Sequence, residues 1–266
     1  MKLAWTLAAA LLACSTGGQA QDGPASDPTC PQGDLAFPRD ADSLCLGEQT
    51  DSYAFSVIYP AAAAGIPALD ALLRADAERR RLWLRGEAES LRADAEPDST
   101  PPPLSFEQGW RITADLPALI AMTSPWNSYT GGAHGMIGYD SILFDRNGGR
   151  RIALADLFIS VEAARAVLQP DFCRLLTAAV RERRDGAAPD LECPDVTEQP
   201  VAICSRSGPA TMMVALLGPY VVGSYAEGPY EVTFPVTPAM LAALKPDYRS
   251  SFGPATAPPP DVDMAC

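Results

Sequence analysis

Histidine is the side chain that titrates near neutral pH without help from its surroundings, and His134 is the single histidine of this sequence. It lies in the run YTGGAHG, residues 129–135, with Ser128 before it and Asp140 after it. A hydroxyl, an imidazole and a carboxylate placed together could hydrolyse cell-wall material, with His134 as the general base. However, the run lacks the G-x-S-x-G elbow that exposes a nucleophilic serine. The sequence therefore favours a turn histidine whose ring bonds nearby backbone, and a hydrolase is the alternative.

Metal and cofactor chemistry find little support. A catalytic zinc ion usually has three protein ligands, most often with two or more histidines, and no C-x2-C pair supplies cysteine ligands here. The sequence has neither a Walker loop nor a dinucleotide-binding fingerprint. We therefore expect no metal and no cofactor, and assign no catalytic residue. The three glycines at positions 131, 132 and 135 predict a backbone with positive φ or very close approach.

Net charge indicates which classes of partner the protein can bind. The formal net charge is −13, and loss of an N-terminal signal containing Lys2 would leave about −14. Such a surface repels the phosphate backbone, so nucleic-acid binding is not expected. It attracts basic partners through long-range steering. Apolar residues make up 47 % of the chain, which is enough to build a folded core.

The N-terminus has the features of an export signal. Lys2 precedes an apolar stretch, residues 3–12, which is shorter than the about 20 residues of a membrane-spanning helix. In the preferred interpretation LLAC, residues 11–14, is a lipobox, and a lipid on Cys14 is the only membrane attachment. In the other, GQA at residues 18–20 is an ordinary cleavage site, and the chain is a soluble periplasmic or secreted protein. Both predict a location in the periplasm or cell envelope.

Six cysteines remain when Cys14 is set aside. An even number in an exported chain predicts disulfide bonds, but six cysteines allow many pairings and the sequence leaves the choice open. Proximity favours two local pairs and leaves a third by default: Cys30 with Cys45, Cys173 with Cys193, and Cys204 with Cys266.

Apolar periodicity and turn residues predict mixed strands and helices. The expected elements are a strand over 51–59, a helix over 66–95, strands over 104–114, 117–124 and 136–145, a hairpin turn at 147–149, helices over 161–168 and 171–184 separated by Pro170, strands over 211–217 and 230–236, and a helix over 238–244. Arginines 79–81 and 85 are expected on a solvated helix face, paired with acidic neighbours.

The elements do not alternate regularly, so the expected class is α+β: a mixed or antiparallel sheet with one long N-terminal helix and further helices packed on it. The expected division is an export signal over 1–20, a Pro- and Gly-rich tether over 21–50, two α+β subdomains over 51–155 and 156–252 that share a core, and a Pro-rich tail over 253–266.

Several runs together resemble one known family. These are YTGGAHG at 129–135, LADLF at 154–158, GPY at 218–220, GSYAEG at 223–228 and YEVTFP at 230–235. The combination resembles the extracytoplasmic domains of the lysozyme-sensing RsiV-like anti-sigma factors, and a similar module of some peptidoglycan deacetylases. The resemblance covers about residues 51–252. The pairs FC at 172–173 and CP at 193–194 also resemble the family's pattern, which supports the Cys173–Cys193 bridge.

The resemblance implies an envelope module rather than a named activity, because the sigma-binding segment, membrane helix and deacetylase domain of those relatives have no counterpart here. We expect a non-catalytic binding module that recognises a basic protein such as a lysozyme-like muramidase, or peptidoglycan, through loops 125–136 and 218–229. The candidate contact residues are Tyr129, Thr130, His134, Tyr220, Tyr225 and Tyr230. The three later tyrosines qualify only if they are exposed, since tyrosines at strand ends usually cap a core.

Overall fold

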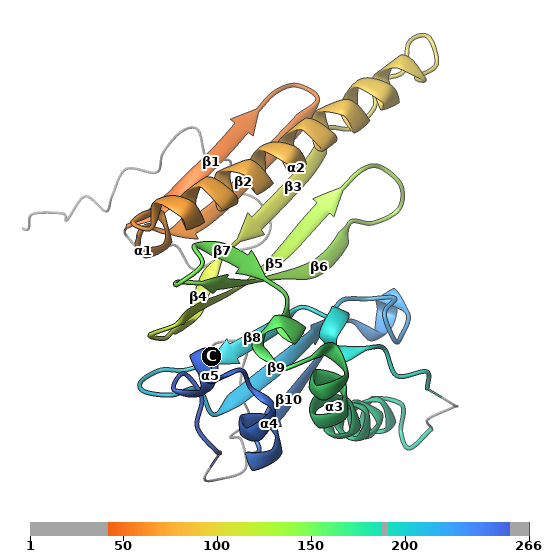
Figure 1. Cartoon of the computed structure of the whole chain (residues 1–266). Helices are drawn as coiled ribbons and strands as arrows, with labels where there is room; N and C mark the ends of the chain where they lie inside the picture. Colours follow the sequence, from red (N-terminus) through yellow and green to blue (C-terminus); the bar gives the residue numbers. More distant parts are fainter. Residues whose placement is uncertain (1–41, 188–190, 256–265) are drawn as a thin grey trace, which may run out of the picture.

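The computed structural model describes residues 42–187, 191–255 and 266. Over these residues the chain is α+β, as expected, with a mixed seven-stranded sheet, a three-stranded antiparallel sheet and two long helices (Figure 1). The long helices are α2 (Pro67–Ala93) and α3 (Val161–Arg183).

The larger sheet is built by the first part of the described chain. Its strand order is β1-β2-β3-β5-β6-β7, and β4 pairs with β5. The strands are β1 (Ser43–Gln49), β2 (Tyr53–Pro60), β3 (Leu104–Gly109), β4 (Arg111–Asp115), β5 (Leu119–Tyr129), β6 (Met136–Asp145) and β7 (Arg150–Ile152). Strands β2 and β3 are parallel, and parallel neighbours need a long crossover. Helix α2 supplies that crossover.

The smaller sheet has the order β10-β9-β8. Its strands are β8 (Val201–Cys204), β9 (Met212–Leu217) and β10 (Tyr230–Pro235). The short helical elements are α1 (Ala61–Ala64), η1 (Leu154–Leu157), η2 (Val196–Glu198), η3 (Tyr225–Glu227), α4 (Pro238–Ala243) and α5 (Pro246–Arg249).

Helix α2 forms where the sequence predicts a helix. Pro67 occupies its first turn, where the missing N–H costs nothing, and apolar residues recur at helical spacing. The side chains of Leu69, Leu73 and Leu84 are fully buried against the larger sheet. In Figure 1 the helix lies across β1, β2 and β3 and leaves the outer part of β5 and β6 uncovered.

Helix α3 corrects the prediction of two helices separated by Pro170. It is continuous from Val161 to Arg183, and Pro170 lies inside it. Proline removes one backbone donor and disfavours a helix interior. Burial outweighs this cost, because residues at a spacing of four share one fully buried face. These residues are Ala164, Leu168, Phe172, Leu176 and Val180.

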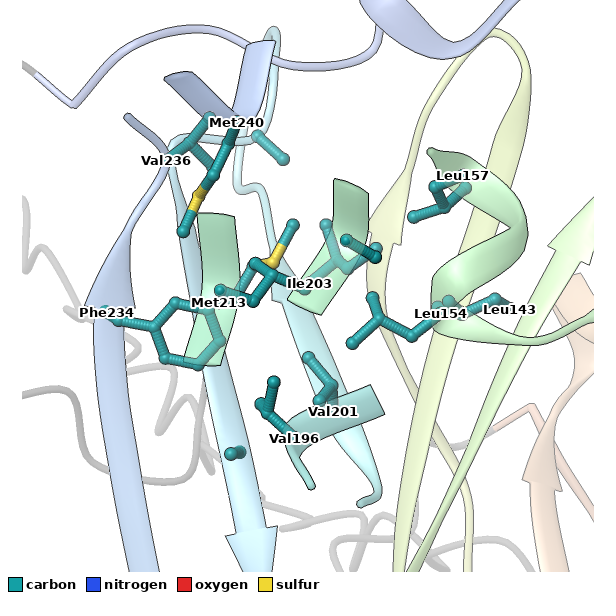
Figure 2. Close-up of a cluster of buried hydrophobic side chains, with 14 of the residues drawn as sticks. Leu143, Leu154, Leu157, Val196, Val201, Ile203, Met213, Phe234, Val236 and Met240 are labelled. Carbon is teal, nitrogen blue, oxygen red and sulfur yellow. The ribbon is translucent and has the colours of Figure 1, made fainter. Parts of the chain in front are cut away.

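The two sheets share a core, which Figure 2 shows in close-up. Leu143 of β6 and Leu154 of η1 belong to the same buried cluster as Ile203 of β8, Met213 of β9 and Phe234 of β10. Two hydrogen bonds also cross between the sheets: Ser205 N–H donates to the Thr113 carbonyl at 3.0 Å, and Val201 N–H to the Ser141 hydroxyl at 3.2 Å.

Strand β1 occupies residues that the sequence assigned to the tether over 21–50. Residues 43–49 pair with β2 in an antiparallel ladder, and residues 21–41 lie outside the described part. The pairing explains the difference, since a neighbouring strand supplies hydrogen bonds that local composition does not reveal. The predicted tail over 253–266 is described only at residues 253–255 and 266.

Disulfide bonds cross-link the second half of the fold. Cys173 and Cys193 are joined, with Cα atoms 5.7 Å apart, and Cys204 is joined to Cys266, as predicted. Cys45 is also disulfide-bonded, and its predicted partner Cys30 lies outside the described residues. Cys14 and the rest of the predicted signal lie outside them too. Across 42–187 and 191–255, no helix combines the length and apolarity needed to cross a membrane.

Candidate binding surface

The run YTGGAHG forms the turn between β5 and β6, as its glycines predict. Gly131 and Gly132 adopt φ of +97° and +90°, a region that side chains with a Cβ rarely occupy. The Tyr129 hydroxyl closes the turn by donating to the Gly132 carbonyl at 3.1 Å. Gly135 is required for a different reason: a Cβ there would lie 2.9 Å from the Ser128 carbonyl oxygen. The turn therefore has a defined backbone conformation.

His134 projects from this turn and is exposed to solvent. Its Nδ1 lies 2.8 Å from the carbonyl oxygen of Gly135, and its ring stacks on Tyr225 with centroids 4.1 Å apart. A nearby backbone bond is what the turn-histidine interpretation expects. The stacking on Tyr225 was not expected, because the two residues lie roughly 90 positions apart in the sequence.

The second loop, residues 218–229, joins β9 to β10 and lies beside β6 and the first loop. A Cβ on Gly218 would lie in van der Waals contact with the Cα of Gly138 in β6, at 3.4 Å, so the two backbones are neighbours. Tyr220 adopts φ of +70°, and its N–H donates to the Gly223 carbonyl at 2.9 Å. In this conformation the Tyr220 ring faces outward, and 58 % of the residue is exposed.

Together the two loops form one aromatic surface, which we call the loop-pair surface: Thr130, His134, Tyr220, Val221 and Tyr225. The Tyr220 and Tyr225 rings are 6.0 Å apart, and Tyr225 in turn stacks on His134. Val221, beside Tyr220, is 43 % exposed. The three rings therefore form a continuous row contributed by hairpins of both sheets.

The end of helix α3 anchors the second loop. The Arg184 guanidinium donates to both carboxylate oxygens of Glu227, at 2.8 and 3.1 Å. The same carboxylate accepts from the Ser224 N–H at 3.1 Å and from the Tyr230 hydroxyl at 2.8 Å. The bond from Arg184, followed by those from Ser224 and Tyr230, lowers the pKa of Glu227 from 4.5 to about 2. Glu227 is thus ionised over the physiological range.

Tyr230 must be removed from the candidate contact residues. It is 1 % exposed, and its ring lies under the Arg183 guanidinium at 3.9 Å. Burial raises the pKa of its hydroxyl, and the bond to Glu227 acts in the same direction. Tyr230 begins β10 and caps the core, which is the usual place of a tyrosine at a strand end. Of the other candidates, Thr130 and Tyr220 are exposed and Tyr129 and Tyr225 are half-buried.

Ser128 and Asp140, the residues that a hydrolase would combine with His134, are engaged elsewhere. Ser128 is buried in β5. The Asp140 carboxylate accepts from Arg80 at 2.6 Å and from the amide of Gln108 at 2.7 Å. Burial raises the pKa of Asp140, and the Arg80 charge opposes this. Within the described ranges, no group of three or more His, Cys, Asp or Glu side chains could hold a metal ion.

The sequence did not reveal a second polar and aromatic cluster beside α2. Arg79 and Arg81 pair with Asp76 and Glu78 on the helix surface, as expected. Arg80 instead reaches across to Asp140 of β6, and its guanidinium lies 5.1 Å from the Phe106 ring centroid. The available signal was Trp83, a large apolar residue at the end of the arginine run.

Of three comparisons with known proteins, the search of solved structures found similar chains. No protein-family model matches the sequence, and the curated proteins give no significant match. Among solved structures, a DUF3298 family protein from Pseudomonas aeruginosa PAO1 is similar, with 16 % identity, a TM-score of 0.47, and coverage of 77 % of this chain and 94 % of its own. A DUF3298 member from Bacteroides fragilis NCTC 9343 has 16 % identity, a TM-score of 0.47, and coverage of 78 % and 94 %. The likeness to these proteins is one of fold at low sequence identity.

Proposed function

We propose that this protein is a non-catalytic binding module of the cell envelope that recognises a basic protein through the loop-pair surface. The observation that carries the proposal is the row His134–Tyr225–Tyr220, which two separate hairpins bring together and which ends in a largely exposed tyrosine. Tyrosine is enriched at the energetic centres of protein interfaces.

The backbone under this row favours binding because it is already ordered. Positive φ at two glycines and the Arg184–Glu227 pair each restrict a loop before any ligand arrives. Ordering a loop during association costs free energy, so a loop held in advance binds more tightly for the same contacts.

Charge supports a basic partner. The net charge of about −14 after signal removal speeds encounter with a cationic protein and adds a salt-sensitive part to the affinity. The motif resemblance to lysozyme-sensing domains points in the same direction, since lysozyme is a basic protein. A lysozyme-type muramidase is therefore the ligand we propose first.

The proposed location is the periplasm or cell envelope. Two disulfide bonds between described residues suggest an extracytoplasmic protein, because reducing compartments rarely allow structural disulfides to persist. A lipid on Cys14 is the proposed anchor. Changing Cys14 to Ala should move the protein out of the detergent phase, and a mature N-terminus at Gln21 would contradict the anchor.

A hydrolase built on His134 would need a carboxylate and a hydroxyl beside the imidazole. The ring contacts of His134 within the described ranges are instead the Gly135 carbonyl and Tyr225. This arrangement supports binding as the role of the turn. If His134→Ala abolishes a measured hydrolysis of cell-wall material while the fold is intact, the hydrolase must replace the binding module.

The test of the proposal is a calorimetric titration of the exported domain with lysozyme at low and at physiological salt. We expect saturable binding at both, weaker at the higher salt, because a packed interface keeps a part that salt does not screen. Binding at low salt alone would indicate nonspecific charge attraction, and binding at neither would remove this class of ligand. A parallel sedimentation assay with purified peptidoglycan tests the cell-wall alternative.

A further inference from the structure

A groove lies beside helix α2, where the helix meets strands β3 and β5 of the larger sheet. The volume of this groove is about 340 Å³, and none of its lining residues belongs to the loop-pair surface. Asp76, Arg79, Arg80 and Trp83 line it from α2, and Phe106 and Trp126 line it from β3 and β5. This volume is at the lower end of the range, about 300–1,000 Å³, that is typical of small-molecule sites.

Two tryptophans provide its apolar walls. Trp126 stacks on the buried Phe106 ring, with centroids 6.3 Å apart and planes inclined by 22°. Its cross-strand partner is Gly138, where a Cβ would lie only 2.3 Å from the indole ring, so the absent side chain makes room for it. Trp83 is 45 % exposed on α2. One wall is therefore packed in place, and the other is open to solvent.

Charged side chains also line the groove. The Asp76 carboxylate bonds both Arg79 and Arg80, and Arg80 is also held by Asp140 at 2.6 Å. Asp76, Arg79 and Arg80 line the groove, and Asp140 contacts Arg80 from outside it. The carboxylates of Asp76 and Asp140 together offset the charge of the two guanidinium groups. The hydrogen-bond donors and acceptors that these side chains do not use among themselves suit a neutral ligand rich in hydroxyl groups.

We propose that the groove between Trp83 and Trp126 binds a neutral saccharide. A pyranose ring has an apolar C–H face, which packs on an aromatic wall, and a rim of hydroxyls, which bonds planar charged groups. A purely apolar ligand would bury Asp76 and the arginines without replacing their water. This site does not depend on the loop-pair surface, so either proposal can be refuted while the other stands.

The test is a tryptophan-fluorescence titration with a neutral N-acetylglucosamine trisaccharide, and with a glucose trisaccharide for comparison. We expect a saturable change in the exported domain, and a dissociation constant weakened by roughly tenfold or more in Trp83→Ala. Binding of either sugar supports the proposal, and preference for the first identifies an amino-sugar glycan as the source.

Leu82→Ala is the matched control, because Leu82 is 42 % exposed beside Trp83 and does not line the groove. It should bind as the unmodified domain does. No saturable change with either sugar, or equal affinity of Trp83→Ala and Leu82→Ala, would overturn the proposal. Lysozyme binding by Trp83→Ala should be unchanged, which separates this result from the test of the loop-pair surface.

Discussion

The Arg184 guanidinium donates two hydrogen bonds, of 2.8 and 3.1 Å, to the carboxylate of Glu227. The pair joins the end of α3 to the loop that carries Tyr220 and Tyr225. Since Glu227 also accepts from Ser224 and Tyr230, one carboxylate organises the whole turn. The conformation of the proposed binding surface therefore depends on an ionised side chain that lies beside it.

This dependence predicts an effect of pH on stability. The pKa of Glu227 falls from 4.5 to about 2 on folding, so its contribution is fully present above 4.5 and is lost as the pH falls toward 2. Urea unfolding should show the domain to be more stable than Glu227→Gln at pH 7, with a difference that shrinks through this acid range. A difference that stays constant with pH would contradict the role of the carboxylate.

Replacing glycine by alanine should have opposite effects on stability at one position in the glycine turn and one position in α2. Gly132→Ala should lower the free energy of unfolding by about 1–2 kcal/mol, because Gly132 adopts φ of +90°. Gly86→Ala should raise it by about 0.5–1 kcal/mol, since Gly86 lies inside α2 with no atom within 4 Å of an added Cβ. Equal effects in urea unfolding would show that the turn is not strained for other residues.

The bridge between Cys173 and Cys193 predicts a loss of stability when it is removed. It closes a sequence separation of 20 residues, and a loop of this size contributes about 3 kcal/mol in the chain-entropy model. The double variant Cys173→Ala/Cys193→Ala should unfold at correspondingly lower urea. Peptide mapping without reductant should recover the linked pair, and free thiols at both positions would refute the bridge.

Local signals in the sequence were sufficient for much of the fold. The helical spacing before residue 95, the glycine turn at 129–135 and the hairpin turn at 147–149 each depend on neighbours in the chain, and each forms as predicted. Strand β1 was missed, because its hydrogen bonds come from β2 rather than from its own composition. The continuous α3 was missed because burial of one helix face outweighs the effect of Pro170.

The candidate surface was predictable in part for the same reason. Both loops carry glycine and tyrosine patterns that mark them as special turns. The stacking of His134 on Tyr225 joins hairpins of two sheets, and the approach of Trp83 to Trp126 joins a helix to a strand. Such contacts depend on the packing of whole elements, which periodicity does not report.

The central claim is that the loop-pair surface binds a basic protein, and the most direct measurement compares two exposed apolar residues. Tyr220 lies at the end of the aromatic row, and Ile159, 62 % exposed, precedes the opposite end of α3, a helix of 23 residues and so about 34 Å long. Calorimetry with lysozyme at physiological salt should show binding weakened by about tenfold or more in Tyr220→Ala and unchanged in Ile159→Ala. Equal affinity of the two variants, or no binding by the unmodified domain, would contradict the account.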